Sequence, residues 1–99
     1  MKLSSFAQLK RELKPGIELK LVDCNIPGHK MLGVARKIIV QQSNAIKFSD
    51  DSWLGLGSTG ETAKDYTFQE NGFTLDNRYR DENYAKYGIM LKYEFVNLG

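Results

Sequence analysis

Hydrophobic residues near the start of the chain recur at helical spacing. They are Phe6, Leu9 and Leu13, and mostly charged residues lie between them. Ser5 followed by Gln8 is the pattern of a capping box, and Pro15 ends the helical pattern. The sequence predicts a helix over about residues 5–14. Two or three turns are not stable alone, so the apolar stripe must pack on another element.

After residue 16 the hydrophobic period changes to the alternation of β-strands. The alternating runs are IELKLV (17–22), MLGVARKIIVQQ (31–42), AIKF (45–48), a short segment around Trp53, and IMLKYEFV (89–96). In the second run, Val34, Arg36, Ile38 and Val40 are expected on one face. The last run is expected to close the sheet.

The stretch KDYTFQENGFTLDN (64–77) predicts a β-hairpin. Asn71–Gly72 favours a two-residue type I′ turn, because both positions of that turn need positive φ. This turn would place Phe68 opposite Leu75. One face of the hairpin would then carry Tyr66, Phe68, Phe73 and Leu75, and the other would be polar.

These elements favour a mainly β (α+β) fold. A short N-terminal helix followed by five or six closely spaced strands, without a βαβ rhythm, predicts a small antiparallel SH3-like barrel. The alternative is a curved α+β roll. We expect residues 1–99 to form a single domain, with the helix at about 5–14 and the barrel at about 17–97.

The amino-acid composition is that of an ordinary globular domain, and it narrows the compartments in which the protein is expected. The chain has 99 residues, of which 41% are hydrophobic and 26% are charged. Polar residues interrupt the N-terminal segment too early for a signal peptide, and no apolar run is long enough to span a membrane. Cys24 is the single cysteine, so no internal disulfide forms. We therefore expect a cytoplasmic protein that does not bind membranes.

Charge is unevenly distributed along the chain. Residues 1–47 carry nine Lys or Arg against three acids, whereas residues 48–99 carry five against nine. Such asymmetry can mark a surface for nucleic acid or for an acidic partner. In a small barrel both halves surround one core, so this polarity need not form a spatial patch.

The segment Gly55-Leu56-Gly57-Ser58-Thr59-Gly60 matches the G-x-G-x-x-G pattern of dinucleotide-binding loops. That pattern works only between a buried parallel strand and a helix, because the helix N-terminus supplies amide donors to the phosphates. Here a short segment precedes it and a hairpin soon follows. Glu61 would also repel phosphate. We interpret residues 55–60 as a flexible loop between strands, and we expect no cofactor.

Catalytic and metal-binding patterns are weak. Cys24 and His29 lie five residues apart and could meet, but a half-buried Cys and an exposed loop His are the more common situation. One Cys and one His supply only two of the ligands that a zinc site needs. Asp50–Asp51 is typical of a turn. We expect neither catalysis nor a bound metal.

Aromatic residues beside cations are the remaining candidates for function. Small β-barrels bind peptides or nucleic acids with such residues. Trp53 is more typical of a core or rim position than of a stacking platform, and the Tyr- and Arg-rich segment 78–87 is either an interaction surface or a structural loop. The candidate partner-binding residues are Arg36, Lys37, Lys47, Trp53, Arg78, Tyr79, Arg80, Tyr84, Lys86 and Tyr87.

Three stretches, SSFAQLKRELKPGIELKLV, MLGVARKIIVQQSNAIKF and LKYEFV, together with SWL, resemble small uncharacterised proteins of Gram-positive prophages and mobile elements. The resemblance implies a cytoplasmic accessory protein and no site residue. Our hypothesis from the sequence is a non-catalytic module that binds a protein partner. The alternative is a β-barrel that binds nucleic acid.

Overall fold

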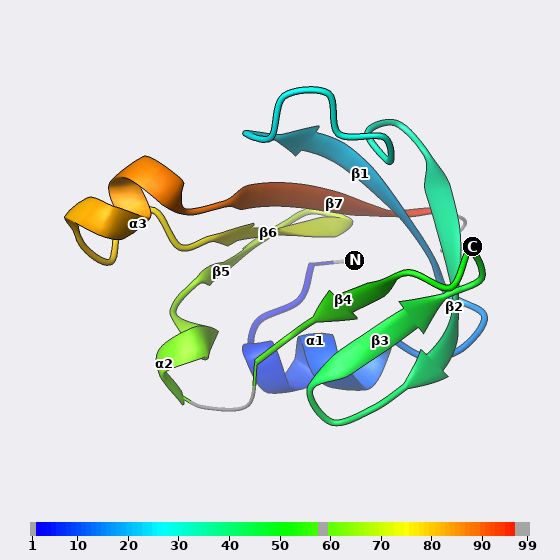
Figure 1. Cartoon of the computed structure of the whole chain (residues 1–99). Coiled ribbons are helices and arrows are strands. Elements are labelled where there is room, and N and C mark those ends of the chain that lie inside the picture. Colours follow the sequence, from blue (N-terminus) through cyan, green and yellow to red (C-terminus); the bar gives the residue numbers. More distant parts are fainter. Residues whose placement is uncertain (1, 58–59, 97–99) are drawn as a thin grey trace.

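The computed structural model describes residues 2–57 and 60–96, and these form seven strands and three helices (Figure 1). In chain order they are α1 (Phe6–Glu12), β1 (Glu18–Cys24), β2 (Ala35–Gln41), β3 (Ala45–Phe48), β4 (Trp53–Gly55), α2 (Gly60–Ala63), β5 (Tyr66–Gln69), β6 (Gly72–Asp76), α3 (Glu82–Tyr87) and β7 (Met90–Val96). None of the helices in this part of the chain has the length and apolar character needed to span a bilayer.

All seven strands belong to one antiparallel sheet in the order β4-β3-β2-β1-β7-β6-β5. The mainly β prediction is confirmed. The sheet curls strongly, but its edge strands β4 and β5 do not pair with each other (Figure 1). The structure is therefore an open seven-stranded sheet and not a closed barrel, and the expected five- or six-stranded SH3-like form is not confirmed.

Helix α1 lies across the open side of the curled sheet (Figure 1). At its start, the Phe6 ring lies 4.7 Å from the ring of Tyr66 on β5. At its end, the side chain of Gln41 on β2 donates a 2.8 Å hydrogen bond to the Lys10 carbonyl. Leu9 is fully buried between these contacts. The helix thus bridges the two halves of the sheet, strands β1–β4 and strands β5–β7. Its side chains fill the space between the two halves, so the edge strands β4 and β5 stay apart.

Capping residues close in sequence set the two ends of α1, and these ends lie near the predicted ones. The Ser5 hydroxyl accepts a hydrogen bond from the Gln8 amide at 3.1 Å, as expected of an N-cap. The Gln8 side chain reaches back to the amide of Ser4 rather than to that of Ser5. At the other end, Leu13 is the C-cap. The helix is therefore slightly shorter than the predicted span.

A β-bulge in β2 changes which residues face the interior. Ile38 pairs with Phe48, but the next paired residue is Val40, which lies opposite Lys47. Ile39 is the extra residue, and cross-strand partners share a face, so Val40 moves to the outer face with Lys47. Arg36 and Ile38 share a face as predicted, and that face is the interior, whereas Val40 does not share it.

The β5–β6 hairpin forms, with a register that differs by two residues from the prediction. Phe68 pairs with Phe73 rather than with Leu75. Asn71 has a positive φ of 62°, but Gly72 is the first residue of β6. A Cβ at Gly72 would collide with the main-chain oxygen of Tyr93, so glycine is needed there for close strand approach and not for the turn. A shift of two keeps every side chain on its predicted face.

Strand β7 lies inside the sheet and pairs with both β1 and β6. Its inward residues Leu91, Tyr93 and Phe95 are buried, which confirms the predicted alternation. The stacked rings of Phe73 and Tyr93 lie 5.5 Å apart. The last strand therefore joins the two halves of the sheet instead of closing its edges.

Replacing Leu9 with alanine tests the role of α1. The truncation leaves a cavity in the core, so we expect the free energy of unfolding to fall by about 2–5 kcal/mol in urea denaturation. Arg11→Ala, at an exposed position of the same helix, is the control and should change stability by less than about 0.5 kcal/mol. Equal effects of the two substitutions would contradict the packing described.

Candidate functional site

The structure divides the candidate residues between two places. Arg36, Lys37, Lys47 and Trp53 lie on strands β2–β4, whereas Arg78, Tyr79, Arg80, Tyr84, Lys86 and Tyr87 lie between β6 and β7. The second group belongs to residues 78–88, which include α3 and project beyond the ends of β6 and β7 (Figure 1). We refer to residues 78–88 as the tyrosine protrusion.

Two bidentate ion pairs anchor the start of the tyrosine protrusion. Arg78 donates to the Asp76 carboxylate from Nε at 3.0 Å and from Nη2 at 2.8 Å. Arg80 donates to the Asp65 carboxylate from Nε at 3.0 Å and from Nη2 at 2.5 Å. Paired hydrogen bonds of this kind fix orientation as well as distance. They hold the two arginines against β5 and β6.

Two asparagines anchor the other end. The Asn77 side chain accepts a hydrogen bond from the Ile89 amide at 2.9 Å. Asn25, from the end of β1, donates to the Gly88 carbonyl at 3.0 Å and accepts from the Met90 amide at 2.9 Å. The tyrosine protrusion is therefore held by polar contacts at both ends.

Asp65 is the central acid of this arrangement. It is only 4% exposed, and its carboxylate accepts a 2.8 Å hydrogen bond from the Tyr79 hydroxyl in addition to those from Arg80. The hydrogen bond to Asp65 raises the pKa of Tyr79, and burial adds to the effect. Asp65 likewise raises the pKa of the Arg80 guanidinium. Asp65 thus sets the positions of two neighbouring side chains of the protrusion.

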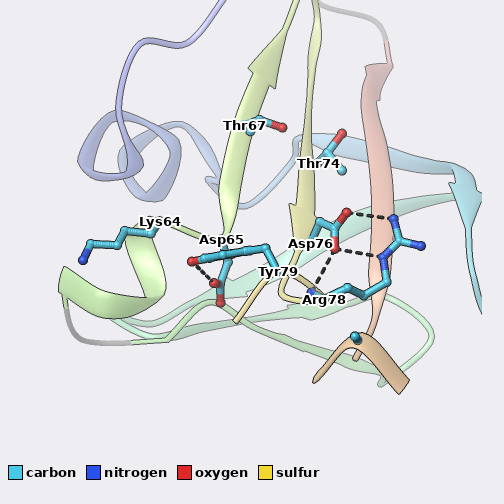
Figure 2. Close-up of a pocket in the computed structure, with 8 residues that line it drawn as sticks. Lys64, Asp65, Thr67, Thr74, Asp76, Arg78 and Tyr79 are labelled. Atoms are coloured by element: carbon cyan, nitrogen blue, oxygen red, sulfur yellow. Dashed lines mark hydrogen bonds and ion pairs between the residues drawn. The ribbon is translucent and has the colours of Figure 1, made fainter. Parts of the chain in front are cut away.

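A pocket of about 580 Å³, lined mostly by polar and charged residues, lies between the base of the tyrosine protrusion and the outer face of β5 and β6 (Figure 2). Its lining residues are Lys64, Asp65, Thr67, Thr74, Asp76, Arg78, Tyr79 and Ala85. Both carboxylates are held by arginines, and the Arg78 hydrogen bonds keep the pKa of Asp76 below its usual value. The pocket therefore offers hydroxyl groups and neutralised ion pairs, which suit hydrogen bonding to a polar group of a partner.

Helix α3 forms the tip of the tyrosine protrusion, and none of its residues is buried. Tyr87 is 72% exposed, and with Tyr84 and Asn83 it lines a shallow apolar groove. The Lys86 ammonium lies 5.2 Å from the centre of the Tyr87 ring. Tyr79, at the base, is 59% exposed. Aromatic surface is thus presented to solvent on a segment whose ends are fixed.

Arg36 does not contribute to an exposed surface. It is only 8% exposed and faces the interior, with its guanidinium 4.1 Å from the Phe48 ring centre. Its Nη atoms donate to the hydroxyls of Ser52 and Tyr93, and its buried Nε has no hydrogen-bond partner within the described residues. Its inward position on β2 removes Arg36 from the set of candidate partner-binding residues.

The remaining candidates lie on the outer face of the β2–β4 half. Trp53 is 51% exposed, and the ammonium of its cross-strand neighbour Lys47 lies 5.9 Å from its ring centre. Lys47 also forms a 3.2 Å ion pair with Asp51. Ile39 is exposed on β2, as is Lys37. These side chains form a mixed apolar and cationic surface that is separate in sequence from the tyrosine protrusion.

Cys24 and His29 each have a local partner. The Cys24 thiol donates to the Ile26 carbonyl, and Nδ1 of His29 accepts from the Met31 amide. Within residues 2–57 and 60–96, no group of three or more His, Cys, Asp or Glu side chains is arranged to hold a metal.

The glycine-rich segment does not have the surroundings of a dinucleotide site. The strand before it, β4, is a three-residue antiparallel edge strand. A Cβ at Gly57, whose φ is +76°, would collide with the Thr62 side chain. Ser58 and Thr59 lie outside the described residues, and so does the expectation of a flexible loop there.

Sequence reasoning missed α3 and the role of Asp65. Asp81 caps α3 by accepting a 3.1 Å hydrogen bond from the Tyr84 amide, and Gly88 follows the last turn. Asp81 and Gly88 are recognisable helix start and stop residues. Asp65 gave no such pattern, because its partners come from a segment about fifteen residues later.

Comparison of the chain with protein-family models, with curated proteins and with solved structures gives no match.

Replacing Asp65 with asparagine tests the hydrogen bond between Asp65 and the Tyr79 hydroxyl. Asparagine is uncharged and leaves the Arg80 charge unpaired, so we expect the pKa of Tyr79 to fall towards its usual value of 10.0. The pH dependence of the Tyr79 ring Cζ chemical shift measures this pKa. Asp76→Asn is the matched control and should leave it unchanged. An unaltered Tyr79 pKa in Asp65→Asn would contradict the hydrogen bond.

Proposed function

We propose that this chain is a non-catalytic module that binds a protein partner through the tyrosine protrusion. The observation that carries the proposal is the exposure of Tyr79 and Tyr87 on a segment anchored by ion pairs and asparagine hydrogen bonds. Binding residues are found disproportionately often on surface segments that a rigid scaffold positions. Here the ends are anchored and the aromatic rings face solvent.

Rigid, exposed tyrosines are well suited to protein recognition. A tyrosine brings a large apolar surface and a hydroxyl into an interface while losing little side-chain freedom. Anchoring the segment before binding reduces the entropy lost on association. The apolar groove beside Tyr84 and Tyr87 and the hydroxyl groups of the pocket behind Tyr79 give the surface both apolar and hydrogen-bonding features. These features resemble the centre and rim of a protein interface.

Nucleic-acid binding is the second candidate, and the charge arrangement opposes it. Arg78, Arg80 and Lys47 are each paired with a carboxylate, and Arg36 is buried. Phosphate contacts require cations whose charge is not already neutralised. Of the six candidate cations, this leaves Lys37 and Lys86 without a carboxylate partner in the described part of the chain.

The resemblance to small prophage and mobile-element proteins supports the context of the proposal. The proposed partner in that context is a protein of the host or of the element itself. A non-catalytic module acting in the cytoplasm agrees with that role. The partner is then a folded or extended protein surface with an apolar site for the tyrosines.

Photo-crosslinking locates the binding surface directly. We expect a photoreactive phenylalanine analogue at position 87 to crosslink a protein in cells of the natural source, and one at the exposed position 11 of α1 not to do so. With the captured protein purified, Tyr84→Ala with Tyr87→Ala should weaken binding about tenfold or more. Ile39→Ala, an exposed apolar control on the other half, should not. Equal capture from both positions, or binding unaffected by the tyrosine changes, would contradict the proposal.

Oligonucleotide binding tests the alternative. We expect labelled single- and double-stranded DNA to show no increase in anisotropy on titration with the protein at low salt. Binding that weakens steeply between low and physiological salt would favour the nucleic-acid function. In that case Lys37→Ala and Lys86→Ala should reduce the slope of affinity against salt.

A further inference from the structure

The edge strand β4 carries unused main-chain hydrogen-bonding groups. Phe48 donates to the Ser52 carbonyl, and Leu56 donates to the Asn44 carbonyl. Hydrogen-bonded and non-hydrogen-bonded pairs alternate along an antiparallel ladder, so Leu54 is bonded to β3 whereas Trp53 and Gly55 are not. The amide and carbonyl groups of Trp53 and Gly55 therefore point away from β3 towards the free edge.

This edge is accessible at both residues. Trp53 is 51% exposed, and Gly55, whose surface is entirely main chain, is also exposed. No heavy atom lies within 4 Å of the position that a Cβ would occupy at Gly55. The other edge strand, β5, is instead bordered by the N-terminal segment, where Lys2 forms a bridge with Glu70. An exposed, unpaired edge is a template for another strand.

We propose that β4 pairs antiparallel with β4 of a second copy of this chain, about a two-fold axis at Leu54. In this register Trp53 of the first copy and Gly55 of the second copy exchange two main-chain hydrogen bonds. Gly55 of the first copy and Trp53 of the second copy do the same. Each of the four outward groups on a copy is then used once. The pairing extends the sheet across the dimer and differs from the protein contact proposed for the tyrosine protrusion.

Side-chain shape favours a second copy as the occupant. Cross-strand partners share a face, so the Trp53 indole of one copy lies over Gly55 of the other, where the space above the glycine is open. Aromatic residues opposite glycine on neighbouring strands are a stabilising combination. The strand supplies both members of this pair, as a two-fold interface requires.

Charge and area are compatible with a weak dimer. The axis at Leu54 places Asp51 level with Gly57 of the second copy, so the acidic turns do not face each other. A contact of two three-residue strands and two indoles is smaller than a standard stable interface. We therefore expect a reversible dimer with a dissociation constant in the upper micromolar range, below about 1 mM.

Sedimentation equilibrium with tryptophan fluorescence tests the dimer. Trp53 is the only tryptophan, so its emission reports on this edge alone. Between about 1 µM and 1 mM, we expect the mean mass to rise towards the dimer and the emission to shift to the blue. Amide hydrogen exchange at Gly55 should slow in parallel. A chain that stays monomeric throughout this range overturns the proposal.

Gly55→Lys is the decisive variant. The open space at Gly55 accommodates a side chain in the monomer, whereas in the dimer that side chain would meet Trp53 of the second copy. We expect unchanged stability and dimerisation weakened at least about tenfold. Ile39→Lys adds the same charge to the same face two strands away, and it should dimerise like the original chain. A dimer that Gly55→Lys does not weaken uses another surface and also overturns the proposal. Neither outcome bears on crosslinking from position 87.

Discussion

The burial of the N-terminal segment in the open side of the sheet is the contact on which the rest of the structure depends. Leu3, Leu9 and Leu13 are all essentially inaccessible to solvent, and they lie in one core with side chains of both halves of the sheet. A seven-stranded sheet that does not close needs another element to cover its interior. Because α1 supplies that cover, β4 and β5 remain separate edges. The Tyr66 hydroxyl, bonded to the Leu56 carbonyl, is a direct polar link between the two sides.

Two arginines show how the same side chain takes opposite roles in this fold. Arg36 is buried over Phe48 and bonded to neutral hydroxyls, so its charge is compensated only indirectly, through Ser52 and its hydrogen bonds with Asp50. Arg80 is paired directly with a buried acid, and it ties a surface segment to the core. A cation in a sequence therefore indicates an anion-binding surface only after its own partners are known. In this chain, carboxylates from the second half neutralise much of the charge on the candidate surfaces.

Short-range patterns in the sequence predicted α1 and the strands but not α3, whereas long-range contacts decided how the elements assemble. The spacing of Leu9 and its neighbours located α1, and strict alternation placed Tyr93 and Phe95 in the core. The faces of the β5–β6 hairpin were predicted although its register was not, because a shift of two residues leaves side-chain orientation unchanged. The contact of Gly72 with Tyr93 and the position of β7 between β1 and β6 each depend on residues distant in sequence, and the bulge at Ile39 depends on the pairing of β2 with β3. The candidate site followed the same rule: its tyrosines were visible in the sequence, but Asp65 and Asn25 could not be connected to them.

The place of β7 between β1 and β6 has a consequence for synthesis of the chain. Cys24 pairs with Leu91, and Glu18 pairs with Val96, so the first strand acquires one of its two neighbours only when the last strand is available. On the ribosome, β1 to β4 emerge as a meander whose inner face, including Leu19 and Leu21, has no opposing half to cover it. Pairings between such distant segments slow folding and prolong the lifetime of partly open forms. The native core is therefore completed only after residues 90–96 have left the exit tunnel, which makes nascent and truncated chains the forms most exposed to proteases and chaperones.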